Sequence, residues 1–151
     1  MTEVAIVEDR SHEAARRFDD HIKQTLKFLD YAPVLHISAR TGDRTPRLLE
    51  AIDRVAKARL RRVPTGELNR FVETVTQSHA PVSPGKKNVR VLYAAQTGVA
   101  PPTFIFFTNV ATTFHFSYER YLANRLRETF GFEGTPIRLE VRARRREEKS
   151  S

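Results

Sequence analysis

The stretch VRVLYAAQTGVAPPTFIFFTNV, residues 89–110, contains two strand patterns separated by a turn, and it determines the expected fold. The first pattern alternates, which is typical of a half-buried strand with its two valines and Tyr93 on one face and Arg90 on the other. The second, residues 103–110, is apolar on both faces and predicts a central strand. The glycine and prolines between them predict the connection.

Flanking segments complete this part of the chain. A helical pattern over 65–77 predicts buried residues Leu68, Phe71, Val72 and Val75. Ser117 is the expected N-cap of a helix that runs to about residue 130. The residues of this helix that are expected to face the core are Tyr118, Tyr121, Leu122 and Leu126. Residues 137–144 alternate as a last strand. The order helix-strand-strand-helix-strand predicts a compact α+β domain with a three-stranded sheet.

The first part of the chain has a different pattern. Ser11 is the expected N-cap of a helix to about Leu29, with an apolar face at Ala15, Phe18, Ile22, Leu26 and Leu29. APVLHIS, residues 32–38, predicts a short buried strand. Thr45 and Pro46 suit the cap and first residue of a helix to about Leu60, with Leu49, Ile52, Val55 and Ala56 inward. Helix, strand, loop and helix are typical of the end of an α/β domain.

The charge is unevenly distributed along the sequence. The chain of 151 residues has a formal net charge of +8, and residues 1–58 contain ten basic and ten acidic residues. The remaining residues contain sixteen basic and eight acidic ones and therefore carry the whole excess. Such asymmetry is typical of nucleic-acid binding, although a solvated basic surface would produce it too.

Several classes of site have little support in the sequence. There is no cysteine, so disulfides and thiolate metal sites are excluded, which fits a cytoplasmic protein. The five histidines (12, 21, 36, 79 and 115) lack metal-site spacing, and no catalytic residues stand out. PGKKN, residues 84–88, lacks the first glycine and the hydroxyl of a phosphate-binding loop and predicts a surface turn. No apolar run is long enough to span a bilayer.

Two features could bind nucleic acid. The last strand sets Arg138, Arg142 and Arg144 on one face, Arg145 and Arg146 extend the charge, and Arg90 is expected on the same side. This stripe could track a phosphate backbone or could be a solvated surface. GFEG, residues 131–134, matches the G-x-x-G clamp of KH domains, but its bulky and acidic middle residues favour a helix C-cap followed by a turn.

The C-terminal half contains, in order, the motifs Tyr-Ala-x-Gln, Pro-Pro-Thr-Phe, Phe-Ser-Tyr-Glu-Arg-Tyr-Leu and Phe-Gly-Phe-Glu-Gly-Thr-Pro-Ile-Arg. Through these motifs it resembles the KH-like domain of the bacterial ribosome-assembly GTPase family EngA (Der). LKFLDYAPVLHISARTG, residues 26–42, resembles the end of that family's second GTPase domain. The resemblance implies a remnant of a P-loop GTPase domain at 1–60, a KH-like domain at 61–144 and a charged tail at 145–151.

The same resemblance implies functions for particular residues. Ser38, Ala39 and Arg40 match the guanine-reading loop, in which the Ala39 N–H would donate to the base. The sequence contains no phosphate-binding loop, switch region or Asn-Lys-x-Asp motif, so GTP and Mg²⁺ are expected in the parent family but no cofactor in this chain. GTP hydrolysis is implied for the parent family and is expected to be absent from the chain alone.

The implied partners are large-subunit ribosomal RNA or a ribosomal particle and the GTPase domains of a parent protein, with no membrane. The resemblance thus implies a fragment of a GTP-binding protein that acts in large-subunit assembly. An alternative from another class is an intramolecular scaffold, whose KH-like sheet docks on the GTPase domains and touches RNA little.

Overall fold

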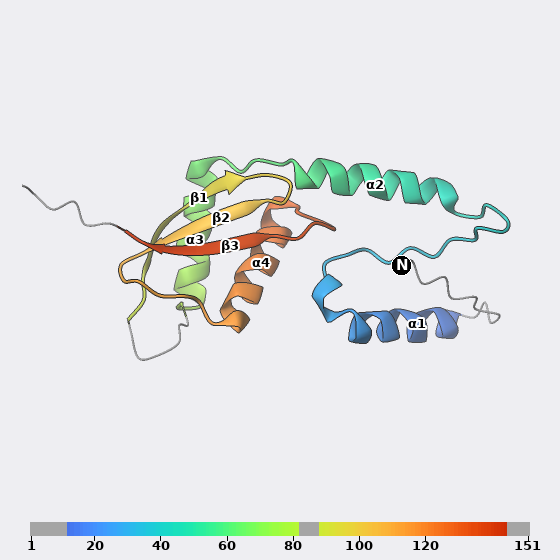
Figure 1. Cartoon of the computed structure of the whole chain (residues 1–151), viewed down its shortest axis with the longest axis horizontal. Helices are drawn as coiled ribbons and strands as arrows, with labels where there is room; N and C mark the ends of the chain where they lie inside the picture. Colours follow the sequence, from blue (N-terminus) through green and yellow to red (C-terminus); the bar gives the residue numbers. More distant parts are fainter. Residues whose placement is uncertain (1–11, 82–87, 145–151) are drawn as a thin grey trace, which may run out of the picture.

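The computed structural model describes residues 12–81 and 88–144 (Figure 1). Its elements are the helices α1 (His12–Thr25), α2 (Thr45–Arg59), α3 (Thr65–Ser78) and α4 (Phe116–Phe130), the short 3-10 helix η1 (Lys27–Leu29), and the strands β1 (Val91–Gly98), β2 (Thr103–Thr108) and β3 (Arg138–Ala143). The predicted α+β class and the order α3-β1-β2-α4-β3 are confirmed.

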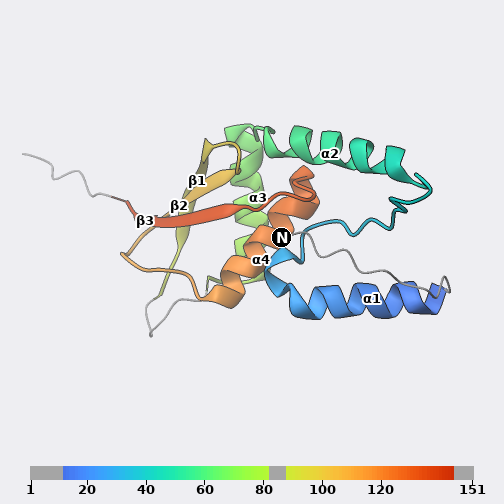
Figure 2. The ribbon, with the colours of Figure 1, turned by 45° about the vertical axis from the view of Figure 1, so that its right-hand side comes forward.

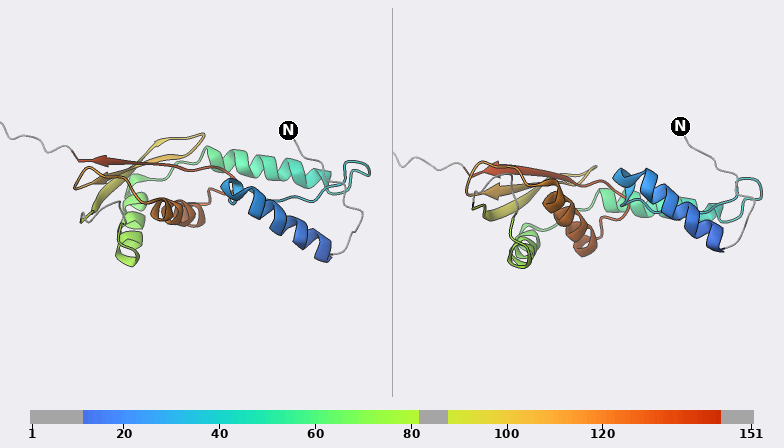
Figure 3. Two further views of the ribbon diagram at one scale, coloured as in Figure 1. Left: turned by 60° about the horizontal axis from the view of Figure 1, so that its bottom comes forward. Right: turned by 90° about the horizontal axis from the view of Figure 1, so that it is seen from below.

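The three strands form one mixed sheet with β2 in the middle, as its pattern predicted. β1 pairs with β2 in an antiparallel arrangement, and β3 pairs with β2 in a parallel one. Helices α3 and α4 lie on the same face of this sheet (Figure 3). Because both helices take one face, the side chains of β2 divide into an inner and an outer set.

The inner face of β2 is the centre of the core. Phe104 and Phe106 are fully buried and make edge-to-face contacts with Phe132 and Phe114, at centroid distances of 5.7 Å and 5.9 Å. The predicted inner residues of α3 (Leu68, Phe71, Val72 and Val75) are all buried against this core. Of those predicted for α4, Tyr118, Leu122 and Leu126 are buried and Tyr121 is half-buried.

Asn69 attaches α3 to the free edge of the sheet. Its side-chain amide donates to the carbonyl of Ala94 at 3.1 Å, and its oxygen accepts from the Ala94 N–H at 2.9 Å. Ala94 is fully buried and lies on β1, an edge strand of the sheet. Asn69 therefore satisfies both backbone groups of Ala94, as a neighbouring strand would.

The ends of α4 confirm one expectation and correct another. Gly131, with φ of 71°, caps the C-terminus in the left-handed conformation, as predicted. Ser117 is not the N-cap. His115 takes that place, and its ring nitrogen Nδ1 accepts from the Ser117 N–H at 3.3 Å.

The predicted faces of β1 are wrong in one respect. Val91 pairs with Thr108 and Tyr93 with Phe107, so β1 advances two residues where β2 advances one. This bulge inverts the alternation because one residue is left without a partner. Tyr93 therefore lies opposite Phe107 on the outer face and not on the inner face with the valines.

The predicted strand at 32–38 is absent. Residues 33–38 adopt no regular structure, and Leu35 and Ile37 are exposed. The physical reason is that a strand requires a hydrogen-bonded neighbour, and the only sheet among the described residues is β1-β2-β3.

The apolar faces predicted for the first two helices are largely uncovered. No residue of α1 is buried, and this helix ends at Thr25, with η1 following it. α2 begins at Thr45 itself, with Arg44 as its N-cap, and buries only Ala51 and Ala58. Leu49 and Ile52, predicted to face inward, are 66% and 53% exposed. Figure 2 shows both helices beyond one end of the sheet, where neither packs on its strands.

The hydrogen bonds of Asn69 lead to a stability prediction. Replacing Asn69 by alanine leaves the buried N–H and C=O of Ala94 without partners, and we expect it to lower the free energy of unfolding by about 1–3 kcal/mol. Urea denaturation followed by circular dichroism measures the change. Gln77→Ala, at an exposed position of the same helix, is the matched control and should change stability by less than about 0.5 kcal/mol. Equal effects of the two variants would contradict this role of Asn69.

The difference in burial between the two parts predicts a difference in local stability. We expect the amides of α1 and α2 to exchange with deuterium faster than those of α3, α4 and β2, or the chain to self-associate through the uncovered faces. Hydrogen-exchange mass spectrometry, with light scattering to establish the oligomeric state, provides the test. Equal protection of both parts in a monomer would show the prediction to be wrong.

Candidate nucleic-acid interface

The loop from Ser38 to Asp43 is tightly bonded within itself. The Ser38 N–H donates to the carbonyl of Asp43 at 3.0 Å, and the Ser38 hydroxyl accepts from the Thr41 N–H at 3.2 Å. Ala39 and Arg40 are exposed at its tip. Within the described part of the chain, the Ala39 N–H has no hydrogen-bond partner and is available to a ligand. The geometry suits an N–H donor to a base oxygen, and the role predicted for these residues stays a prediction.

The basic residues of β3 lie along the outer face of the sheet. Arg138, Arg142 and Arg144 are exposed, while Leu139 and Val141 between them pack against the core. Glu140 shares the outer face, and its carboxylate pairs with the Arg142 guanidinium at 2.9 Å. Sequence reasoning missed this partial neutralisation, although the parity of position 140 with 138 and 142 indicates it.

Arg90 and Arg144 lie on either side of β2 at one end of the sheet. Arg90 is exposed, and its carbonyl accepts from the N–H of Asn109 at 3.1 Å. The Arg144 N–H donates to the carbonyl of Thr108 at 2.9 Å. Because Thr108 points inward, alternation puts both arginine side chains on the outer face, where the sequence placed them. Arg145, Arg146 and most of the PGKKN segment lie outside the described residues.

Helix α2 and the residues after it pack against the GFEG loop. Phe132 is fully buried in the core, and Glu133 pairs with Arg54 of α2 at 3.1 Å. Both glycines have positive φ, 71° at Gly131 and 69° at Gly134. A Cβ atom at Gly134 would collide with Val55, and one at Gly131 would lie 2.6 Å from the Arg61 guanidinium. These glycines allow the close approach of residues 55–61, so the cap-and-turn interpretation is confirmed, and Val55 and the Arg61 guanidinium fill the space that a phosphate clamp would need.

Further hydrogen bonds fasten the end of α2 to the sheet. Arg59 exchanges two bonds with Ala100, one from its guanidinium at 3.2 Å and one accepted by its carbonyl at 3.1 Å. Gln96 accepts from the Val63 N–H at 2.7 Å and donates to the carbonyl of Arg61 at 2.9 Å. The segment between α2 and α3 is therefore attached to the sheet through hydrogen bonds of both its side chains and its backbone.

A second contact joins α4 to the segment before the Ser38 loop. The Arg127 guanidinium lies over the Tyr31 ring, 4.9 Å from its centroid, and donates to the carbonyl of Thr135 at 3.3 Å. Burial lowers the pKa of Arg127 below its ordinary value, and Asp30 and Tyr31 oppose that shift. The sequence carried no signal for this cation–π pair, because its two members are far apart in the chain.

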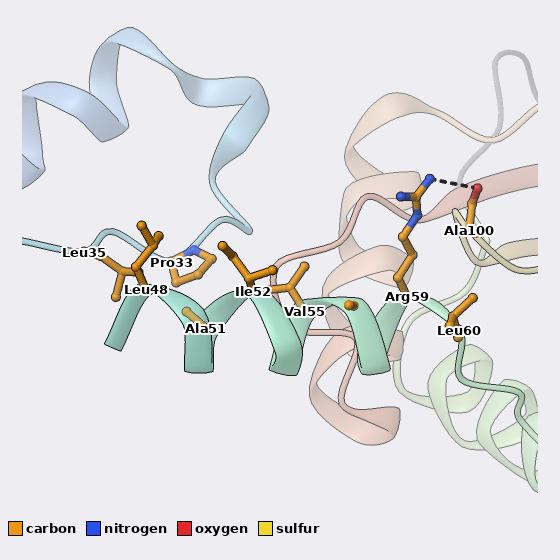
Figure 4. Close-up of a pocket in the computed structure, with 10 residues that line it drawn as sticks. Pro33, Leu35, Leu48, Ala51, Ile52, Val55, Arg59, Leu60 and Ala100 are labelled. Atoms are coloured by element: carbon orange, nitrogen blue, oxygen red, sulfur yellow. Dashed lines mark hydrogen bonds between the residues drawn. The ribbon is translucent and has the colours of Figure 1, made fainter. Parts of the chain in front are cut away.

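A groove of about 500 Å³ runs along α2 (Figure 4). Its lining is apolar apart from Arg59 and consists of Pro33, Leu35, Leu48, Ala51, Ile52, Val55, Ala56, Arg59, Leu60 and Ala100. The groove offers almost no polar group to orient a ligand or to move a proton, so it is not a candidate active site.

Other kinds of site find no support in the described residues. No three histidine, aspartate or glutamate side chains in this part of the chain are grouped so that they could hold a metal ion. None of the described helices is long and apolar enough to cross a membrane.

Comparison with known proteins identifies the family of this domain. Residues 62–142, which contain the sheet with α3 and α4, match the family model for the C-terminal KH-domain-like region of EngA bacterial GTPase enzymes. The chain belongs to the EngA family. The boundaries predicted for its domains stay a prediction.

Curated members of the EngA family are similar to more than this region. The chain is 44% identical over 136 residues to the GTPase Der of Desulforamulus reducens, which is 90% of this chain and 31% of that protein. It is 51% identical over 122 residues to the GTPase Der of Moorella thermoacetica, which is 81% of this chain and 28% of that protein. The chain therefore spans about a third of the length of these relatives.

The geometry of the Ser38 loop generates a prediction on nucleotide binding. We expect the purified chain of 151 residues to bind GTP more weakly than micromolar and not to hydrolyse it. The Ala39 N–H is a single donor, whereas affinity in P-loop GTPases rests on phosphate and Mg²⁺ contacts. Isothermal titration with GTP and Mg²⁺, and a phosphate-release assay, measure both properties. Micromolar or tighter binding would contradict the prediction.

Proposed function

We propose that this chain binds large-subunit ribosomal RNA through the outer face of its sheet and acts in assembly of the large ribosomal subunit. The observation that carries the proposal is the row of exposed arginines on that face, on a KH-like domain of the EngA family. GTP and Mg²⁺ would belong to a longer EngA protein and not to this chain alone. The proposed role implies a cytoplasmic location.

The physical basis of this binding is electrostatic. Guanidinium groups on an open face can neutralise phosphates in any order of bases, and each neutralised phosphate releases counterions. The G-x-x-G loop, which KH domains use to clamp the backbone, is covered by α2 in this protein. Binding should therefore depend strongly on salt and weakly on sequence.

Docking within a GTPase is the second candidate, and a specific observation favours it. The KH-like domain is attached to residues 31–61 by the Arg54–Glu133 ion pair, the bonds of Arg59 with Ala100 and the Arg127–Tyr31 contact. The uncovered groove along α2 offers a further apolar surface to GTPase domains. In this account the basic face meets protein instead of RNA.

Salt dependence and charge reversal separate the two candidates. We expect the affinity for ribosomal RNA to fall with salt with a log–log slope on the order of −3, if about four phosphates of a single strand are contacted. Changing Arg142, Arg144, Arg145 and Arg146 together to Glu should abolish most binding and leave the fold intact. Fluorescence anisotropy at several salt concentrations, with circular dichroism of each variant, measures these effects.

The control reverses the same number of charges elsewhere. Arg16, Arg47, Lys57 and Arg70 are exposed on three helices, and changing all four to Glu gives the same net charge. We expect this variant to retain most of the binding. If the first quadruple variant bound RNA at wild-type strength, the outer face would not be the RNA site and docking would become the better account.

A further inference from the structure

Two aromatic rings are stacked on the outer face of the sheet, where neither α3 nor α4 covers them. Tyr93 of β1 and Phe107 of β2 are register partners, with ring centroids 4.4 Å apart and planes inclined by 16°. Tyr93 is 39% exposed although it is a large aromatic residue on a folded sheet. We call these two rings the aromatic platform.

Arginines lie beside the aromatic platform on this face, along β3 and at one end of the sheet. Phe107 is also the register partner of Arg142, so Tyr93, Phe107 and Arg142 form one row across the three strands. Neighbouring strands are about 4.8 Å apart, which brings a guanidinium within side-chain reach of the rings. Arg90 and Arg144 lie at the end of the same face, next to this row. The platform is thus an apolar π-surface next to three positively charged side chains.

We infer that the aromatic platform stacks an unpaired base of single-stranded RNA, while Arg90, Arg142 and Arg144 hold the adjoining phosphates. This inference rests on the proposed RNA binding and adds the form of RNA that is bound. The base lies against Tyr93, because one face of that ring contacts Phe107 and the other has no aromatic partner among the described residues. Base–aromatic stacking tolerates any sequence, because every base has a π-face.

Charge favours RNA over an apolar protein surface as the occupant of this face. The guanidinium groups of Arg90, Arg138 and Arg144 make no ion pair in the described chain, and only Arg142 is paired, with Glu140. An apolar protein partner would have to desolvate these cations, whereas a nucleic-acid strand supplies a phosphate for each. A duplex keeps its bases inside the helix, so the platform selects for unpaired strands.

The test compares RNA with and without bases. The first probe is a fluorescently labelled single-stranded ten-nucleotide RNA of mixed sequence, and the second is an abasic ribose-phosphate strand of the same length. Anisotropy at fixed salt should show that the wild-type chain binds the first probe about 5- to 150-fold more tightly than the second, the range expected for stacking of one base. It should also prefer the first probe to the same RNA annealed in a duplex.

Three variants identify the ring that carries the effect. Tyr93→Leu keeps an apolar side chain but removes the π-surface, and it should bind both probes as weakly as the wild type binds the abasic one. Tyr93→Phe keeps the ring and should retain the preference. Phe116→Ala removes an aromatic residue that is 67% exposed at the start of α4 and should change nothing. The salt slope should be the same in all four proteins, because no phosphate contact is altered.

The outcomes distinguish this inference from the proposed function. If the wild type binds no RNA at low salt, both are wrong. Two outcomes would overturn only the stacking inference. The first is binding with the expected salt slope but without distinction between the two probes, and the second is a folded Tyr93→Leu variant that keeps the preference for bases. In either case a protein partner would become the better occupant of the aromatic platform. The wild-type comparison of the two probes decides the matter even if Tyr93→Leu fails to fold.

Discussion

Burial of Phe104 and Phe106 on one face of β2 is the constraint on which the rest of the fold depends. Both side chains are fully buried, and Phe114, the helices α3 and α4, and the residues after Gly131 supply the side chains that cover them. Two buried phenylalanines contribute several kcal/mol of hydrophobic free energy, which is comparable to the whole stability of a small domain. Because a strand alternates, their inward position forces Ile105 and Phe107 outward.

The side chains that β2 presents on the outer face are therefore fixed by those it buries on the inner face. Which side chains β1 adds to the outer face depends on how this edge strand pairs with β2. Asn69 bonds to both backbone groups of Ala94, and Ala94 pairs with Phe106. The bulge before Tyr93 then turns that ring outward beside Phe107. Tyr93, which is exposed, and Phe107, which is half-buried, therefore share this face with the arginines of β3.

The sequence correctly predicted those elements whose buried residues follow the local periodicity of a helix or strand. The inner residues of α3, the cap at Gly131 and the alternation of β3 were all predictable, because each depends on local periodicity or on a single backbone conformation. The side of the sheet that Tyr93 occupies was not predictable, since a bulge changes alternation without any change in composition. The predicted strand at 32–38 and the inner face of α2 were wrong because both require neighbours that the described residues do not provide. Of the candidate site, the sequence showed which arginines share a face, but not that Glu140 pairs with one of them.

The GFEG loop explains why the proposed RNA binding is assigned to the outer face and not to the usual KH surface. A G-x-x-G clamp works because its glycines let a phosphate approach the backbone. Here Val55 and Arg61 occupy the space beside both glycines, Phe132 belongs to the core, and Glu133 is committed to Arg54. A phosphate beside Gly134 would require α2 to move, which would break that ion pair and the bond of Arg59 with the sheet. A phosphate beside Gly131 would require the Arg61 guanidinium to leave the carbonyl of Phe130. The same contacts that attach α2 to the KH-like domain thus remove its standard binding surface, and the exposed cationic surface that remains beside aromatic rings is the outer face of the sheet.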